Sequence, residues 1–223
     1  MRRDFQRPFE LPVGATEVVL IRHGSARHRA PAGPADLVDG HSDPELTELG
    51  HRQAEAVSRR LGAARPAGLF VTPLRRTQQT AAPLARRIGR EPVVVPELNE
   101  VHLGDWEGQL DPRVARDDAL THKLFAVERW DVIPNAEPMR QFADRVRRGL
   151  DRLVDAGGPD QTVLAVVHGG VIAEACRQVT GSRAFAFLYA DNGSITRLMR
   201  LASRRWALIS FNDTAHLPGS DGR

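Results

Sequence analysis

The sequence is poor in lysine and in aromatic residues, and both shortages bear on whether the protein could bind nucleic acid. Lys123 is the only lysine, so the 31 Lys and Arg residues are almost all arginine. They face 28 Asp and Glu, which leaves a net charge of +3 in 223 residues. The pI of about 9.9 therefore reflects how little titrates between pH 7 and 10, not a basic patch. Aromatic residues make up only 5%, and the arginines are dispersed among acids, which disfavours a nucleic-acid-binding module.

Cysteine and long apolar runs are equally scarce. Cys176 stands alone in an apolar helical context, which excludes an intramolecular disulfide framework and a zinc site built on cysteines. Residues 1–11 lack the apolar stretch of a signal peptide, and no apolar run reaches the roughly 18 residues that cross a bilayer. We therefore expect a cytoplasmic protein without a membrane partner, in which Cys176 is a buried small hydrophobic residue.

Short runs of β-branched residues alternate with longer amphipathic segments. Buried strands are predicted at 17–22 (EVVLIR), 68–72 (GLFVT), 92–95 (PVVV) and 162–167 (TVLAVV). Helices are predicted at about 48–62, 74–88, 138–155 and 170–180. Strands that are apolar on both faces are typical of a parallel sheet covered by helices on both sides. The pattern predicts a three-layer α/β/α sandwich with a mostly parallel central sheet.

Two later runs, 194–201 (SITRLMRL) and 205–211 (RWALISF), alternate apolar and polar residues. They predict antiparallel strands joined by a short turn, at or near a sheet edge that is a candidate surface for a homodimer.

A single domain is expected to span residues 1–223, with its core at about 17–211. Residues 109–136 predict an insertion of helical pieces, and the tail from Asn212 is expected to fray.

Helix boundaries have local causes. Thr47 is a predicted N-cap, and Gly62 is predicted to end the same helix in a left-handed conformation. Thr72 followed by Pro73 predicts the start of the next helix.

Charged side chains follow each predicted strand of the parallel sheet. His23 comes after the first strand, Arg76 after the second, Glu100 after the third and His168 after the fourth. Ligands of open α/β sheets bind outside the carboxyl ends of the strands. We therefore expect these four residues to converge although they are distant in sequence.

The chemistry of this set favours a phosphoryl group. Two imidazoles and the guanidinium groups of Arg22 and Arg76 present donors around one point, together with backbone N–H groups at Gly24 and Gly169. Glu100 is the exception, because an ionised carboxylate repels phosphate. A carboxyl group kept there fits a proton donor to a leaving oxygen.

Five motifs, in order, resemble the histidine phosphatase superfamily, in the branch typified by cofactor-dependent phosphoglycerate mutase. They are IRHG at 21–24, LTELGHRQA at 46–54, TPLRRTQQTA at 72–81, LNEVHLGDWEG at 98–108 and VHGG at 167–170. The resemblance spans about residues 17–200 and implies a phosphoglycerate mutase-like fold.

The resemblance also implies roles. His23 is implied as the nucleophile that takes the phosphoryl group as a phosphohistidine. Arg22, Arg76 and His168 are implied as a clamp on the phosphoryl oxygens. Glu100 is implied as the acid that protonates the leaving group and then as the base that activates water. No metal or other cofactor is implied.

The sequence departs from the family pattern where substrates are selected. Two and five positions after the RHG glycine, the family commonly places Thr or Ser and then Asn, whereas this chain has Ala26 and Arg29. Either Arg29 adds a cation to the phosphate-binding set, or the loop 26–41 follows another path. A Gly-Gly-Glu-Ser-like stretch appears as NAEP, which keeps only Glu137.

Nearby residues receive lesser roles. We expect Arg75 to be a solvated helix residue, Glu107 to be an architectural hydrogen-bonding group, and Asn192 to belong first to a turn and second to the phosphate site. The other histidines lack an HExxH motif or a Cys/His cluster, so no metal site is assigned.

The leading hypothesis is a metal-independent phosphomonoester hydrolase that acts on a small phosphorylated metabolite. Residues 103–108 (LGDWEG) resemble the phosphatase branches, whereas mutases typically carry a tyrosine-containing version and longer insertions. Two alternatives stay open: cofactor-dependent mutase-type phosphotransfer, and a non-catalytic binder of a phosphorylated ligand. Tight phosphate binding without turnover would favour the binder.

Overall fold

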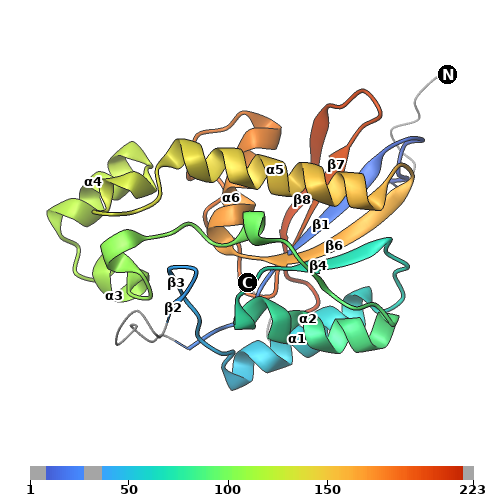
Figure 1. The fold of residues 1–223 in the computed structure, drawn as a ribbon, viewed down its shortest axis with the longest axis horizontal. Helices are drawn as coiled ribbons and strands as arrows, with labels where there is room; N and C mark the ends of the chain where they lie inside the picture. The colour runs from blue at the N-terminus through green and yellow to red at the C-terminus, as the bar shows by residue number, and fades with distance from the viewer. Residues whose placement is uncertain (1–8, 28–36, 218–223) are drawn as a thin grey trace.

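A six-stranded mixed sheet runs through the centre of the computed structural model, which describes residues 9–27 and 37–217 (Figure 1). Its strands, in the order β5-β4-β6-β1-β7-β8, are β5 (Val93–Val94), β4 (Gly68–Val71), β6 (Gln161–Val167), β1 (Thr16–Arg22), β7 (Ile195–Arg200) and β8 (Trp206–Asp213). The first four are parallel, and β7 is antiparallel to both β1 and β8. The predicted mostly parallel sheet with an antiparallel pair at one edge is confirmed.

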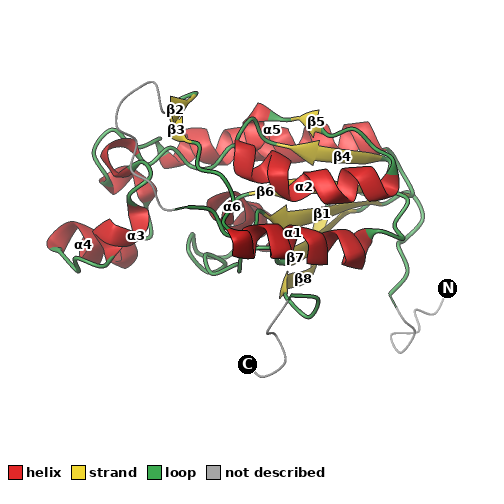
Figure 2. Ribbon diagram, turned by 90° about the horizontal axis from the view of Figure 1, so that it is seen from below, coloured by secondary structure: helices red, strands yellow, loops and turns green. Residues whose placement is uncertain are grey.

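Helices cover both faces of this sheet (Figure 2). They are α1 (Glu48–Leu61) and α2 (Arg75–Ile88) on one face and α5 (Met139–Gly157) and α6 (Gly169–Thr180) on the other. Alternate residues of β1 serve the two layers: Val18 and Leu20 join the core under α5 and α6, whereas Val19 and Ile21 join the core under α1 and α2. This alternation explains why the strand is apolar throughout.

Smaller elements lie at the end of the sheet where the parallel strands have their carboxyl ends (Figures 1 and 2). They are the hairpin of β2 (Leu37–Val38) and β3 (His41–Ser42), the helices α3 (Leu110–Val114) and α4 (Ala119–Val127), and the single turns η2 (Pro96–Leu98), η3 (Gly104–Trp106) and η4 (Trp130–Val132). In the described part of the chain, no helix is long and apolar enough to cross a membrane.

The helix boundaries confirm one prediction and correct two. The Thr47 hydroxyl accepts a hydrogen bond from the Gly50 N–H at 3.1 Å and caps α1, as predicted. Gly62, however, is right-handed, with φ of −67°, so the predicted left-handed end is wrong. The start at Thr72 is also wrong, because α2 begins at Arg75 with Leu74 as its N-cap. The Thr72 hydroxyl instead bonds within the buried site described below.

Two further predictions, on the burial of one strand and on the fraying of the tail, are also corrected. The segment 92–95 is not a buried strand, because β5 is the edge of the sheet and leaves Val93 48% and Val94 41% exposed. The tail does not fray at Asn212, since that residue belongs to β8 and the His216 Nε2 donates to the Gly193 carbonyl at 3.0 Å. The rest of that prediction, residues 218–223, lies outside the described residues. Cys176 is buried as predicted, and burial raises the pKa of its thiol to about 12.

Candidate functional site

A cavity of about 270 Å³ lies at the carboxyl end of β1 and is lined by Arg22, His23, Arg76 and Glu100. Arg22 is the last residue of β1, and His23 continues the strand by donating its N–H to the Val167 carbonyl at 2.9 Å. The structure therefore brings together side chains that follow three different strands of the sheet.

The His23 imidazole is held as a neutral base. Its Nδ1 donates to the Gly24 carbonyl at 2.8 Å, because a carbonyl oxygen can only accept, and the lone pair is left on Nε2. Burial lowers the pKa of His23 well below its usual 6.5, and the charges of Arg76 and Arg22 lower it further. A neutral imidazole with an exposed lone pair is a competent nucleophile at neutral pH.

The loop after His23 is fixed by residues of the two helices beneath it. The Gly24 N–H donates to the Thr80 hydroxyl at 2.9 Å, and the Ser25 N–H donates to the Gln53 side chain at 2.8 Å. A Cβ on Gly50 would lie only 2.1 Å from the Ser25 carbonyl oxygen, so this close approach requires glycine. These contacts explain the Gly and Gln of the 46–54 motif and the Thr of the 72–81 motif.

Two arginines supply positive charge to the cavity: Arg76 is buried, and Arg22 is partly buried. The Arg22 guanidinium donates to the Ala190 carbonyl, and Arg76 Nη1 donates to the Ser42 carbonyl at 2.8 Å. Burial lowers the pKa of both groups, and the charge of Glu100 opposes that shift. Guanidinium stays protonated at physiological pH, so both remain cations aimed at the cavity.

His168 is fully buried and lies edge-on to His23, with the ring centroids 5.2 Å apart. Its Nε2 lies 3.0 Å from the Thr72 hydroxyl, whereas its Nδ1 has no hydrogen-bond partner in the described part of the chain. Arg22 Nε also has no hydrogen-bond partner in the described part of the chain. It lies close to the start of α6, because a Cβ on Gly169 would be only 3.3 Å from it. Two unsatisfied nitrogens at the start of α6 are the feature that a bound tetrahedral anion would satisfy.

The Glu100 carboxylate is held against the start of α6. The Val101 N–H donates to one of its oxygens at 2.9 Å and the Gly170 N–H to the other at 3.1 Å. A Cβ on Gly170 would lie 2.5 Å from the first oxygen, so only glycine admits the carboxylate there. The carboxyl group is thus fixed at the cavity wall, within reach of an atom bound beside His23.

Two side chains that hold the Glu100 backbone, the partly buried Arg145 and the buried His41, were not predicted as site residues. Arg145 of α5 donates to the Glu100 carbonyl at 2.6 Å and to the Asn99 carbonyl, and it pairs with Glu137 at 2.7 Å. His41 Nε2 donates to the Glu100 carbonyl at 2.9 Å. The unusual NAEP stretch singled out Glu137, but nothing local in the sequence connects Arg145 or His41 with Glu100.

The remaining predicted residues fall as follows. Glu107 is architectural, since it accepts from the Ser42 N–H at 2.9 Å and from the Leu103 N–H at 3.0 Å. Arg75 is an exposed helix residue, as predicted, and its side chain also pairs with Asp43 at 2.9 Å. Asn192 lines the cavity and donates to the His23 carbonyl at 2.9 Å. Arg29 and most of its loop lie outside the described residues.

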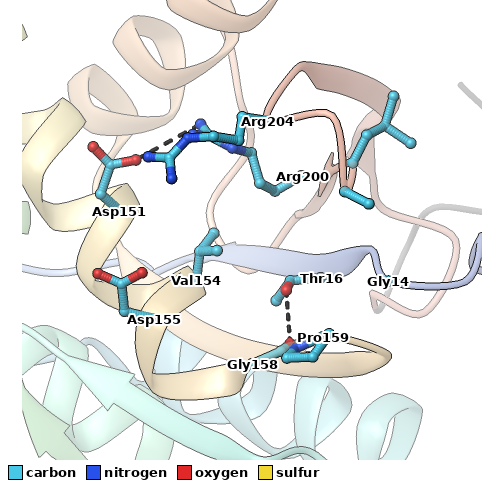
Figure 3. Close-up of a pocket in the computed structure, with 11 residues that line it drawn as sticks. Gly14, Thr16, Asp151, Val154, Asp155, Gly158, Pro159, Arg200 and Arg204 are labelled. Atoms are coloured by element: carbon cyan, nitrogen blue, oxygen red, sulfur yellow. Dashed lines mark hydrogen bonds and ion pairs between the residues drawn. The ribbon is translucent and has the colours of Figure 1, made fainter.

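A larger hollow of about 520 Å³ lies at the opposite end of β1, about 20 Å away along the strand (Figure 3). Thr16 there donates to the Gly158 carbonyl at 2.7 Å, and Arg200 lies 3.7 Å from Asp151 (Figure 3). None of the residues that converge at the carboxyl end lines this hollow. Within residues 9–27 and 37–217, no three His, Cys, Asp or Glu side chains gather in a way that could hold a metal ion.

Comparisons with known proteins agree on one family. The sequence profile of the histidine phosphatase superfamily (branch 1) matches residues 18–214. A metal-independent phosphoserine phosphatase of Arabidopsis thaliana is 30% identical over 206 residues, which cover 91% of this chain and 83% of that protein. A glucosyl-3-phosphoglycerate phosphatase of Mycobacterium tuberculosis is 34% identical over 171 residues, or 71% of this chain and 73% of that protein. The solved complex of a mycobacterial glucosyl-3-phosphoglycerate phosphatase with inorganic phosphate has a TM-score of 0.72 and 31% identity, and the match covers 90% of this chain and 98% of that chain.

Proposed function

The chain belongs to the histidine phosphatase superfamily as a phosphatase, and on that basis we propose that it hydrolyses small phosphate monoesters through a phosphohistidine on His23, without a metal ion. One observation carries the proposal. A buried His23, whose pKa burial and the charges of Arg76 and Arg22 hold well below its usual value, shares its cavity with both guanidinium groups and with the carboxyl group of Glu100. This arrangement provides a nucleophile, an anion clamp and a proton donor in one place.

In the first step, His23 Nε2 attacks the phosphorus and the bond to the ester oxygen breaks. Protonated Glu100 gives its proton to the departing oxygen, so that an alcohol leaves. Arg22, Arg76 and His168 stabilise the charge on the three phosphoryl oxygens. In the second step, Glu100 takes a proton from water, the water oxygen attacks the phosphorus, and the N–P bond breaks to release phosphate and restore His23.

The proposal predicts that p-nitrophenyl phosphate is hydrolysed at the same rate with and without excess EDTA. The measurement is the release of nitrophenol and of inorganic phosphate by the full chain after dialysis against chelator. Both products should appear in equal amounts, with no transfer of the phosphoryl group to added 3-phosphoglycerate. Chelator-sensitive turnover, or no turnover on a broad panel of phosphate esters, would contradict the proposal.

We also propose that Thr72 is a positioning residue for His168. The Thr72 hydroxyl lies 3.0 Å from His168 Nε2 and can donate its proton to that nitrogen. In the arrangement that we propose, it does so and not to the Thr77 hydroxyl, which is also 3.0 Å away. The proton of His168 then lies on Nδ1, where it can be donated to a phosphoryl oxygen. The opposite tautomer would present a lone pair to an anion.

Thr72→Val is therefore expected to lower kcat/KM about tenfold, the loss that corresponds to one hydrogen bond of roughly 1.4 kcal/mol. The inhibition constant of inorganic phosphate should rise by a similar factor, and nitrogen NMR of labelled histidine should show a changed tautomer of His168. Thr72→Ser keeps the hydroxyl and should restore all three quantities. An unchanged tautomer in Thr72→Val would assign Thr72 a packing role only.

A further inference from the structure

A second cavity, of about 330 Å³, adjoins the one that holds His23. Its volume falls within the range of small-molecule sites. Arg22, Glu100 and Asp111 line both cavities, whereas His23 lines only the first. We call the second cavity the leaving-group chamber; its apolar walls are Leu110, Val114, Phe125, Trp130, Leu188 and Tyr189.

The direction of the reaction places the organic part of a substrate in this chamber. An in-line displacement requires the leaving oxygen to lie opposite the attacking nitrogen across the phosphorus. If His23 attacks from the first cavity and Glu100 protonates the leaving oxygen, the carbon skeleton continues past Glu100. The chamber begins at that point, because Glu100 and Arg22 are shared by both cavities.

The walls of the chamber concentrate a scarce kind of side chain. The chain has 8 Phe, 3 Trp and 1 Tyr, and the chamber is lined by Phe125, Trp130 and the single tyrosine, Tyr189. Trp130 is buried and packs on Phe185 at 4.7 Å between centroids, which fixes the floor. Phe125 is 37% and Tyr189 75% exposed, so two rings stand open to water at the mouth. An apolar ligand would cover that surface favourably.

The charges around the chamber are mostly negative. Among the described residues that line it, Arg22 is the only cation, and Asp111 and Asp191 are carboxylates in addition to the proton donor Glu100. Burial lowers the pKa of Arg22, and the charges of Asp191 and Asp111 oppose that shift, so both carboxylates act on the same part of the chamber. With Arg22 committed to the phosphoryl group and the Ala190 carbonyl, a carboxylate on the substrate would meet like charge.

We propose that the leaving-group chamber selects phosphate monoesters of flat aromatic alcohols that carry no carboxylate, and that it disfavours carboxylated leaving groups such as glycerate. This inference rests on the proposed function of the site, because it concerns the part of the substrate beyond the phosphoryl group. Burial of aromatic surface favours an aromatic leaving group, and like-charge repulsion disfavours a carboxylated one. Both effects therefore favour the same class of substrate.

The test compares benzylic phosphates whose leaving alcohols have similar acidity, so that differences report binding in the chamber. The full chain should hydrolyse the naphthylmethyl phosphate ester with a specificity constant about tenfold or more above that for the para-carboxybenzyl phosphate ester. Phe125→Ala should lower the preference for naphthylmethyl phosphate over ethyl phosphate about fivefold. Val127→Ala is the matched control, because Val127 is 46% exposed on the same helix and does not line the chamber.

Equal specificity constants for the naphthylmethyl and carboxybenzyl esters, or a preference unaffected by Phe125→Ala, would overturn the inference. The first comparison uses the unaltered chain, so it is decisive even if Phe125→Ala does not fold. Failure of the proposed function looks different: p-nitrophenyl phosphate would not be hydrolysed, or its hydrolysis would not depend on His23. If hydrolysis depends on His23 but shows no aromatic preference, the inference alone is wrong.

Discussion

His23→Ala is expected to lower the hydrolysis of p-nitrophenyl phosphate by at least about 10⁴-fold, the scale seen when a covalent nucleophile is removed. Alanine removes the only group proposed to bond to phosphorus, while the arginines and Glu100 remain. The site should still bind phosphate, since the guanidinium groups of Arg22 and Arg76 are unchanged. We therefore expect loss of kcat with a much smaller change in the affinity for inorganic phosphate.

The covalent step can be observed directly. A rapid acid-free quench after mixing with radiolabelled phosphate ester should yield a labelled chain that is stable in base and labile in acid, as a phosphohistidine is. His23→Ala should show no label. His51→Ala is the control, because His51 is exposed on α1, away from the cavity, and should keep both label and turnover. Labelling of the His23→Ala chain would assign the nucleophile elsewhere.

Glu100→Gln is expected to slow alkyl phosphates about 10²- to 10³-fold but p-nitrophenyl phosphate less than about tenfold. Nitrophenolate is a stable anion and can leave without being protonated. An alkoxide is strongly basic and must be protonated as it leaves, so only cleavage of the alkyl substrate depends on a proton donor. The substitution keeps the shape of the side chain, but the new NH₂ group must face an N–H donor at Val101 or Gly170. Because of this unfavourable contact, we expect a small loss of activity with both substrates.

The measurement is kcat/KM for β-glycerophosphate and p-nitrophenyl phosphate in both forms of the chain, because kcat/KM reports formation of the phosphohistidine and leaves out its hydrolysis, in which Glu100 acts as base with either substrate. Glu107→Gln is the matched control, since Glu107 lines the same cavity but holds Ser42 and Leu103 by hydrogen bonds. It should affect the two substrates by the same factor. Equal loss for both substrates in Glu100→Gln would reject the proton-donor role.

The layers of the fold were predictable because residue type indicates which positions are buried. The strand β1 is apolar at every position from Val18 to Ile21, and a strand buried on both faces requires helices on both sides. The exposure of Val93 and Val94 was not predictable in this way. The run at 93–95 is as apolar as the central strands, and only the order of strands shows that it forms an edge.

The candidate site likewise has a part that the sequence predicts and a part that it does not. His23, Arg76, Glu100 and His168 follow strands, so the rule that strand ends converge places them together from sequence alone. Their support could not be predicted. Arg145 reaches Glu100 across 45 residues of sequence, and no local pattern requires that contact.

The sequence by itself determined the layered α/β architecture and the set of residues at the ends of the strands, because hydrophobic periodicity and strand polarity are local properties. Only the tertiary structure decided the hydrogen bond between the Thr72 hydroxyl and His168 Nε2, across 96 residues, and the aromatic chamber beside Glu100. Both depend on which side chains packing brings into contact, and packing joins residues whose sequence separation carries no signal. Composition only counts Phe125, Trp130 and Tyr189, whereas the fold gathers them around one cavity.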